Sequence, residues 1–125
     1  MTRIALLTCS NTTQDMGCSS FMCLEGMRSM SGQFARYKDK GGAELAGIIS
    51  CAGCPTTIAP EKLLGRVRSL TSLGVEAVHL SSCMMSICPF KNKYLDLLRT
   101  EFPDVKFVQG THGTPETEQQ FRQMA

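Results

Sequence analysis

Four short runs of strand length alternate with segments of helical periodicity, and this alternation restricts the fold more than any other feature. The runs lie at 3–8, 45–50, 75–81 and 105–108, and the first has the continuously apolar centre of a strand buried on both faces. A strand–helix order repeated four times predicts a parallel sheet with helices on both faces, because right-handed crossovers place the helices there. We therefore expect a flavodoxin- or Rossmann-like α/β three-layer sandwich of about four strands.

The 125 residues are enough for one domain, and we expect a single domain over 1–125. Apolar residues at three- and four-residue spacing predict a helix over 21–34, and further helices are expected at 60–73 and 91–101, with a short one at 115–124. Residues 84–89 are expected to form a loop. His79 lies inside the third predicted strand, where a hydrogen-bonded core histidine is expected.

The composition argues against several classes of partner. The net charge of +2, the scatter of Lys and Arg and the absence of Trp argue against nucleic acid. No run approaches the roughly 20 apolar residues that span a bilayer, and no signal peptide is visible. We therefore expect a cytoplasmic protein, in a compartment where clustered cysteines bind metal or do redox work. The oligomeric state and any small-molecule substrate are left undecided.

Seven cysteines are the unusual part of the composition, and the predicted topology brings them to one edge of the sheet. The carboxyl ends of parallel strands share an edge, and open α/β folds bind their ligands there. Each candidate follows a predicted strand. Cys9 stands at the end of the first, with Cys18 and Cys23 in the loop and first helical turn beyond it; the others are Cys51 and Cys54 after the second, Cys83 and Cys88 after the third, and His112 after the fourth.

This arrangement favours a metal or cluster held by thiolates. Structural zinc takes four N or S ligands, commonly from C-x2-C pairs such as Cys51 and Cys54. Iron–sulfur clusters also take four thiolates, and cysteines followed by proline, as at Cys54 and Cys88, occur in such sites. The residues do not decide between zinc and an iron–sulfur cluster. The predicted inner ligands are Cys9, Cys51, Cys54 and Cys83, and the secondary candidates are Cys18, Cys23, Cys88 and His112.

Two alternative functions use the same thiols. Cys51 and Cys54 match the C-x-x-C of a thiol-based oxidoreductase near a βαβ unit, although the next helix is expected only near residue 60. The other alternative is a metal carrier or sensor that exchanges its ion with a partner. Whether the chain is an enzyme is undecided. The candidates for a spare reactive thiol are Cys23, in the first turn of a predicted helix, and Cys88.

Several of these motifs, taken in order, resemble the CGGC domain family. Cys51-Ala52-Gly53-Cys54-Pro55 follows an apolar strand, Ser82-Cys83 follows the next, and Thr111-His112 follows the last. The resemblance covers roughly residues 3–112 and implies a cysteine-rich metal-binding domain, with zinc as the expected ion. The name-giving motif has a glycine where this chain has Ala52, which argues against a left-handed backbone there. The resemblance implies roles for Cys9, Cys51, Gly53, Cys54, Cys83 and His112.

Overall fold

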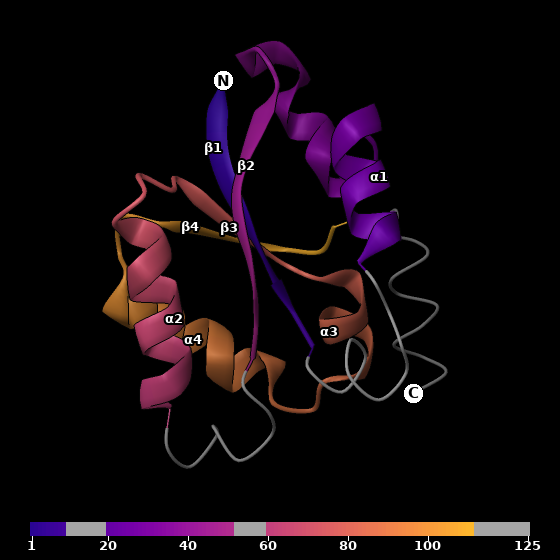
Figure 1. The fold of residues 1–125 in the computed structure, drawn as a ribbon. Helices are drawn as coiled ribbons and strands as arrows, with labels where there is room; N and C mark the ends of the chain where they lie inside the picture. Colours follow the sequence, from indigo (N-terminus) through magenta and orange to yellow (C-terminus); the bar gives the residue numbers. More distant parts are fainter. Residues whose placement is uncertain (10–19, 52–59, 112–125) are drawn as a thin grey trace.

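The protein is built on a four-stranded parallel sheet (Figure 1). The structure, a computed structural model, describes residues 1–9, 20–51 and 60–111. The strands are β1 (Thr2–Thr8), β2 (Ala43–Ser50), β3 (Ala77–Leu80) and β4 (Lys106–Gln109). They are ordered β2-β1-β3-β4, and each pairs in parallel with its neighbour. This is the flavodoxin-like strand order, so the predicted α/β class is confirmed.

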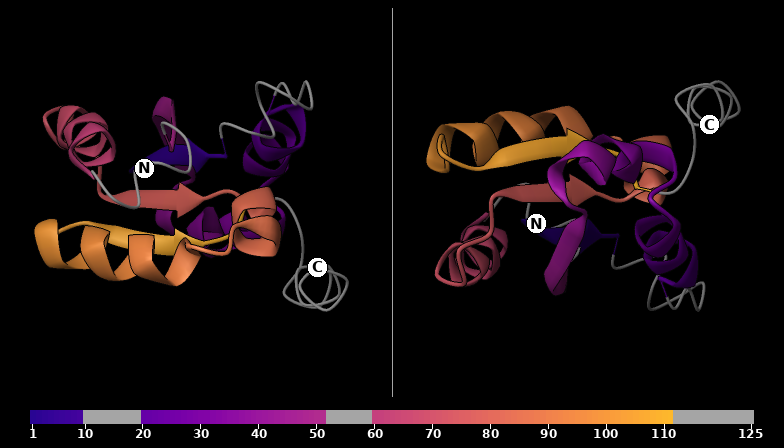
Figure 2. Two further views of the ribbon diagram at one scale, coloured as in Figure 1. Left: turned by 90° about the horizontal axis from the view of Figure 1, so that it is seen from below. Right: turned by 90° about the horizontal axis from the view of Figure 1, so that it is seen from above.

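Helices cover both faces of the sheet (Figures 1 and 2). The α-helix α1 (Phe21–Ser29) and the 3-10 helix η2 (Gly32–Lys40) lie on one side, and α2 (Glu61–Thr71) and α4 (Lys91–Glu101) lie on the other. A short helix, α3 (Ser82–Ile87), follows β3. The chain moves outward from β1 to β2 and then returns past β1 to β3 and β4. Right-handed crossovers in these two directions place α1 on one face and α2 and α4 on the other.

β1 is the central strand of the core. Its residues from Ile4 to Thr8 are all buried. Ile4 and Leu6 pack into the cluster beneath α1 and η2, whereas Ala5 and Leu7 pack into the larger cluster beneath α2 and α4. β1 therefore joins the two halves of the core. Each of its fully buried aliphatic side chains stabilises the fold by about 1.5–3 kcal/mol.

The helix predicted over 21–34 is divided in two, and this part of the prediction is wrong. α1 ends at Ser29, where Met30 adopts a left-handed backbone with φ of 54° and Gly32 follows with φ of 58°. The N–H of Ser31 closes the helix end by donating to the carbonyl of Gly26 at 3.0 Å. A left-handed residue after the last turn is a common helix terminator, so the core residues beyond it enter from η2.

The loop predicted over 84–89 is also wrong, because most of it is helical. β3 ends at Leu80, and Ser81 caps α3 by accepting a hydrogen bond from the N–H of Met84 at 3.3 Å. Serine at this position satisfies a backbone donor that would otherwise be left unpaired. The cap turns the chain inward, so that Met84 and Met85 are completely buried as core residues.

Two other expectations concern the terminal helix and the crossing of a membrane. The helix predicted at 115–124 lies outside the described residues. None of the described helices combines the length and the apolar character that crossing a bilayer requires.

His79 is a hydrogen-bonded core histidine, as predicted. Its side chain is completely buried, and its Nδ1 lies 2.9 Å from the carbonyl oxygen of Gly110. A carbonyl only accepts, so Nδ1 carries the proton and Nε2 accepts from the hydroxyl of Tyr37 at 2.6 Å. Burial, aided by the charges of Arg36 and Lys106 and opposed by the bond to Gly110, lowers the pKa of His79 to about 4.

We expect this histidine to make folding stability depend on pH. The unfolded chain takes up a proton on His79 near the ordinary pKa of 6.5, whereas the folded chain does so only near 4. Its contribution is therefore fully present above pH 6.5 and is lost as the pH falls through 4. The free energy of unfolding, measured with urea at a series of pH values, should fall by about 3 kcal/mol over this range.

The substitution His79→Gln tests the assignment, because glutamine keeps a donor and an acceptor but does not titrate. This variant should show a much shallower dependence on pH. His112→Gln, measured in the presence of a chelator, should retain the wild-type slope. An unchanged slope in His79→Gln would show that another group is responsible.

Candidate functional site

The carboxyl ends of β1 and β2 bring two cysteines side by side. After a register shift between Ile4 and Ala5, the two strands pair residue by residue as far as Thr8 and Ser50. The N–H of Cys51 then donates to the carbonyl of Thr8 at 3.0 Å, so Cys51 continues the ladder one step beyond β2. Cys9 is the next residue of the neighbouring chain segment, and it therefore lies beside Cys51.

Both of these cysteines face the same side of the sheet. The exposed fraction is 6% for Cys9 and 7% for Cys51, and both belong to the core cluster beneath α2 and α4. Neighbouring strands are about 4.8 Å apart, and residues opposite one another project to the same face. Two of the four predicted inner ligands are thus adjacent, buried and on one face.

Cys83 and Cys88 lie at the two ends of α3. Both are partly buried and pack against the same cluster as Cys9 and Cys51. The sulfur of Cys83 lies 3.0 Å from the hydroxyl oxygen of Ser81. Cys88 follows the helix, and its N–H donates to the carbonyl of Met84 at 3.0 Å. The short helix therefore presents a thiol from each of its ends to this side of the sheet.

Cys23 belongs to the opposite face. It lies in the first turn of α1, as predicted, but only 5% of it is exposed, and it packs in the cluster beneath α1 and η2. A hydrogen bond of 3.2 Å joins its sulfur to the hydroxyl oxygen of Thr111. Cys23 therefore lies on the other face of the sheet from Cys9 and Cys51. A role for Cys23 as a reactive thiol stays a prediction.

Ser82 and Thr111 form a reciprocal pair that links α3 to the end of β4. The N–H of Ser82 donates to the hydroxyl of Thr111, and the N–H of Thr111 donates to the hydroxyl of Ser82, each at 3.1 Å. In the sequence, both residues were recognised only as parts of the motifs that resemble the family, and the hydrogen bonds between them were not predicted. The available signal was a hydroxyl residue just after each of two strands, but their partnership depends on β3 and β4 being neighbours.

Three candidate ligands, Cys18, Cys54 and His112, lie outside the described residues. Over residues 1–9, 20–51 and 60–111, no three side chains of His, Cys, Asp or Glu are grouped so that they could hold a metal ion. No disulfide joins any two of the five cysteines in these ranges. The ligand set of Cys9, Cys51, Cys54 and Cys83 therefore stays a prediction. Three of the four are described, and of these Cys9 and Cys51 are adjacent, whereas Cys83 does not form a metal-binding group with them.

Comparison with protein families matches the chain to the CGGC domain over residues 3–112. The chain belongs to the CGGC domain family. The match covers the four described strands, except for the first residue of β1, and includes every cysteine of the chain. It confirms the resemblance seen in the sequence and supports a metal as the partner of this CGGC domain at the level of the family. Comparisons with curated proteins and with solved structures give no significant match.

We expect the hydroxyl of Thr111 to matter for the stability of this edge. The substitution Thr111→Val keeps the shape of the side chain but leaves the buried N–H of Ser82 without its acceptor. The free energy of unfolding in urea should fall by about 1–3 kcal/mol. Thr100→Val is the matched control, because that exposed hydroxyl only donates to the carbonyl of Asp96 within α4. The control should change stability by less than about 0.5 kcal/mol, and an equal loss in both variants would contradict the assignment.

Proposed function

We propose that this CGGC domain binds a thiophilic metal, as a zinc ion or an iron–sulfur cluster, at the carboxyl edge of its sheet. The proposed ligands are Cys9, Cys51, Cys54 and Cys83. The observation that carries the proposal is the burial of Cys9 beside Cys51, on one face, at the ends of adjacent strands.

The spacing of this pair suits a shared metal. Two thiolates on one tetrahedral zinc lie about 3.8 Å apart, because each Zn–S bond is about 2.3 Å. Neighbouring strands are about 4.8 Å apart, so small rotations about the side-chain bonds bring two thiols on one face to a common ion. Cys54 follows Cys51 with the C-x-x-C spacing that zinc and iron–sulfur sites both use.

The surroundings of the pair also favour a bound cation. Two neighbouring thiolates out of water repel each other and lose their hydration, and a metal ion offsets both effects as the thiols release their protons. The hydroxyl of Ser81 lies 3.0 Å from the sulfur of Cys83, where it is able to donate to a thiolate. When bound, zinc supplies a cross-link between strand ends, and a cluster also supplies electron transfer.

Anaerobic purification followed by analysis of zinc, iron and sulfide tests the proposal. We expect either stoichiometric zinc, or iron together with sulfide and visible absorption. Iron with sulfide would exclude the zinc version, and zinc without sulfide would exclude the cluster. Protein that contains no stoichiometric metal, and takes up none when zinc or iron and sulfide are supplied, would refute both.

Single substitutions locate the ligands. Cys9→Ser and Cys51→Ser should each weaken metal binding by about tenfold or more, because each removes a thiolate. Cys23→Ser is the matched control: it lies on the other face, and serine keeps a hydrogen-bonding group beside Thr111. A metal content that depends on Cys23 and not on Cys9 or Cys51 would refute the proposed ligand set.

The same adjacency favours one second candidate, a thiol-based oxidoreductase. The spacing of about 4.8 Å between neighbouring strands lies within the range of about 4.4–6.8 Å that disulfides span between Cα atoms. In this reaction Cys9 and Cys51 lose two protons and two electrons to form a disulfide, while a disulfide substrate is reduced to two thiols.

Treatment of metal-free protein with oxidised glutathione, followed by peptide mapping, tests this candidate. A link between Cys9 and Cys51 would support it, whereas a link between Cys51 and Cys54 would support the C-x-x-C version. Protein that forms no intramolecular disulfide would exclude both.

A further inference from the structure

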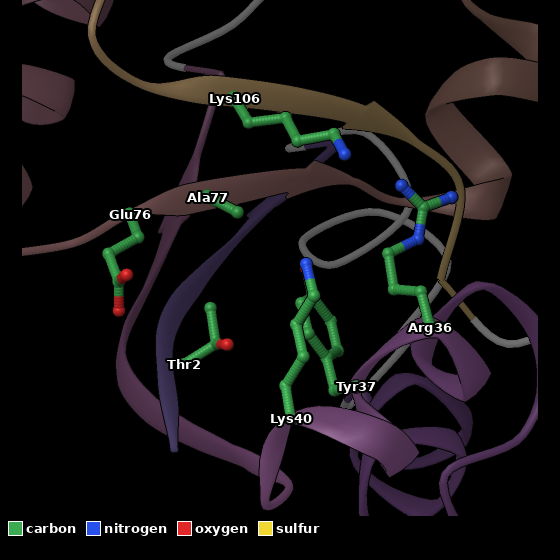
Figure 3. Close-up of a pocket in the computed structure, with 7 residues that line it drawn as sticks. All are labelled: Thr2, Arg36, Tyr37, Lys40, Glu76, Ala77 and Lys106. Carbon is green, nitrogen blue, oxygen red and sulfur yellow. The ribbon is translucent and has the colours of Figure 1, made fainter.

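A pocket of about 210 Å³ opens at the amino-terminal end of the sheet, opposite the thiols. Thr2 from β1, Glu76 from the residues before β3 and Lys106 from β4 line it on the side of the sheet. Arg36, Tyr37 and Lys40 line it from η2 (Figure 3). This pocket shares no residue with the candidate metal site.

Three basic side chains converge on this space. Figure 3 shows the charged ends of Arg36, Lys40 and Lys106 pointing into the region between η2 and the sheet. Within the part of the chain that the structure describes, no ion pair engages any of the three. Like charges gathered in a concave site produce a positive potential that attracts anions.

Arg36 is held in a fixed orientation by its own helix. Its Nε donates to the carbonyl of Gln33 at 3.0 Å, and its Nη2 donates to the side-chain oxygen of Gln33 at 2.9 Å. A guanidinium has five N–H donors in a planar fork. The two bonds to Gln33 therefore orient the fork and leave further donors for a ligand.

The acidic residue of the lining is turned away from this charge. The carboxylate of Glu76 accepts a hydrogen bond from the backbone N–H of Arg3 at 2.9 Å. Figure 3 shows it pointing away from the three basic ends. Its negative charge therefore opposes the positive potential of the pocket from the side away from the three basic ends.

The positive charge also reaches the back wall of the pocket. Burial raises the pKa of Tyr37; the charge of Arg36 opposes that rise, and the more weakly acting charge of Glu76 adds to it. Burial lowers the pKa of His79, behind Tyr37, and the charges of Arg36 and Lys106 lower it further. Two of the three basic residues thus act on the same buried pair from the pocket side.

We propose that this pocket binds a tetrahedral oxyanion, as inorganic phosphate or as the phosphate group of a small phosphomonoester. The fork of Arg36 matches two phosphate oxygens, and the ammonium groups of Lys40 and Lys106 supply point charges. The hydroxyl of Thr2 is a further donor. This inference does not depend on metal binding, because the two sites lie at opposite ends of the strands.

Calorimetric titration at low ionic strength, with inorganic phosphate and separately with glycerol phosphate, tests the proposal on the full chain. We expect saturable binding that Arg36→Gln and Lys106→Gln each weaken by about tenfold or more. Glu76→Gln should strengthen binding, because it removes a negative charge while its side-chain oxygen still accepts from Arg3. Lys62→Gln is the control of equal charge, on an exposed lysine of α2 across the sheet.

The outcomes separate a built site from general attraction to a basic protein. Tighter binding of glycerol phosphate identifies an ester ligand, and tighter binding of inorganic phosphate identifies the free ion. Absence of saturable binding, or equal weakening by Lys62→Gln and Lys106→Gln, would overturn the proposal. Nuclear magnetic resonance supplies a second measurement: phosphate should shift the backbone amides of Tyr37 and Lys106 and leave those of Cys9 and Cys51 unchanged. The reverse pattern would also overturn it.

Discussion

The burial of β1 on both faces and its pairing on both edges is the constraint on which the rest of the structure depends. β1 bonds to β2 on one side and to β3 on the other, and its central residues are completely buried. A strand in this position cannot shift its register without exposing apolar side chains and unpairing backbone groups. Its carboxyl end is therefore fixed between the ends of two other strands, with the N–H of Cys51 bonded to Thr8 and that of Ser81 bonded to Leu7.

The two ends of the sheet offer different chemistry. At the carboxyl edge, buried thiols provide soft ligands in surroundings with little water, which suit a thiophilic metal. At the amino-terminal end, exposed basic groups suit a hard oxyanion. The helix η2 contacts both regions: Tyr37 lines the basic pocket and bonds to His79, while the N–H of Gln33 donates to the carbonyl of Thr111 at 3.0 Å. His79 and η2 therefore brace the sheet between its two ends.

Sequence patterns predict the elements well where packing and propensity agree. The helix over 91–101 is found with the same bounds, and each predicted strand is found within a few residues. The failures lie where local geometry competes with periodicity. The apolar spacing of 21–34 continues through Met30 and Gly32, but the backbone turns left-handed at both, and periodicity carries no information on that turn. Ser81 extends a strand pattern by side-chain type, yet its hydroxyl caps a helix instead.

The sequence by itself determined the α/β class, the family and the presence of cysteines after successive strands, because strand and helix periods and C-x-x-C spacing are local properties of the chain. Only the tertiary structure decided which of these cysteines are neighbours. Cys9 and Cys51 meet because β1 and β2 are adjacent, whereas Cys23 turns to the opposite face and bonds to Thr111. The basic pocket was equally invisible in the sequence. Arg36 and Lys106 are far apart along the chain and come together only because η2 packs across the amino-terminal ends of the strands, so a modest net charge conceals a local concentration of positive charge.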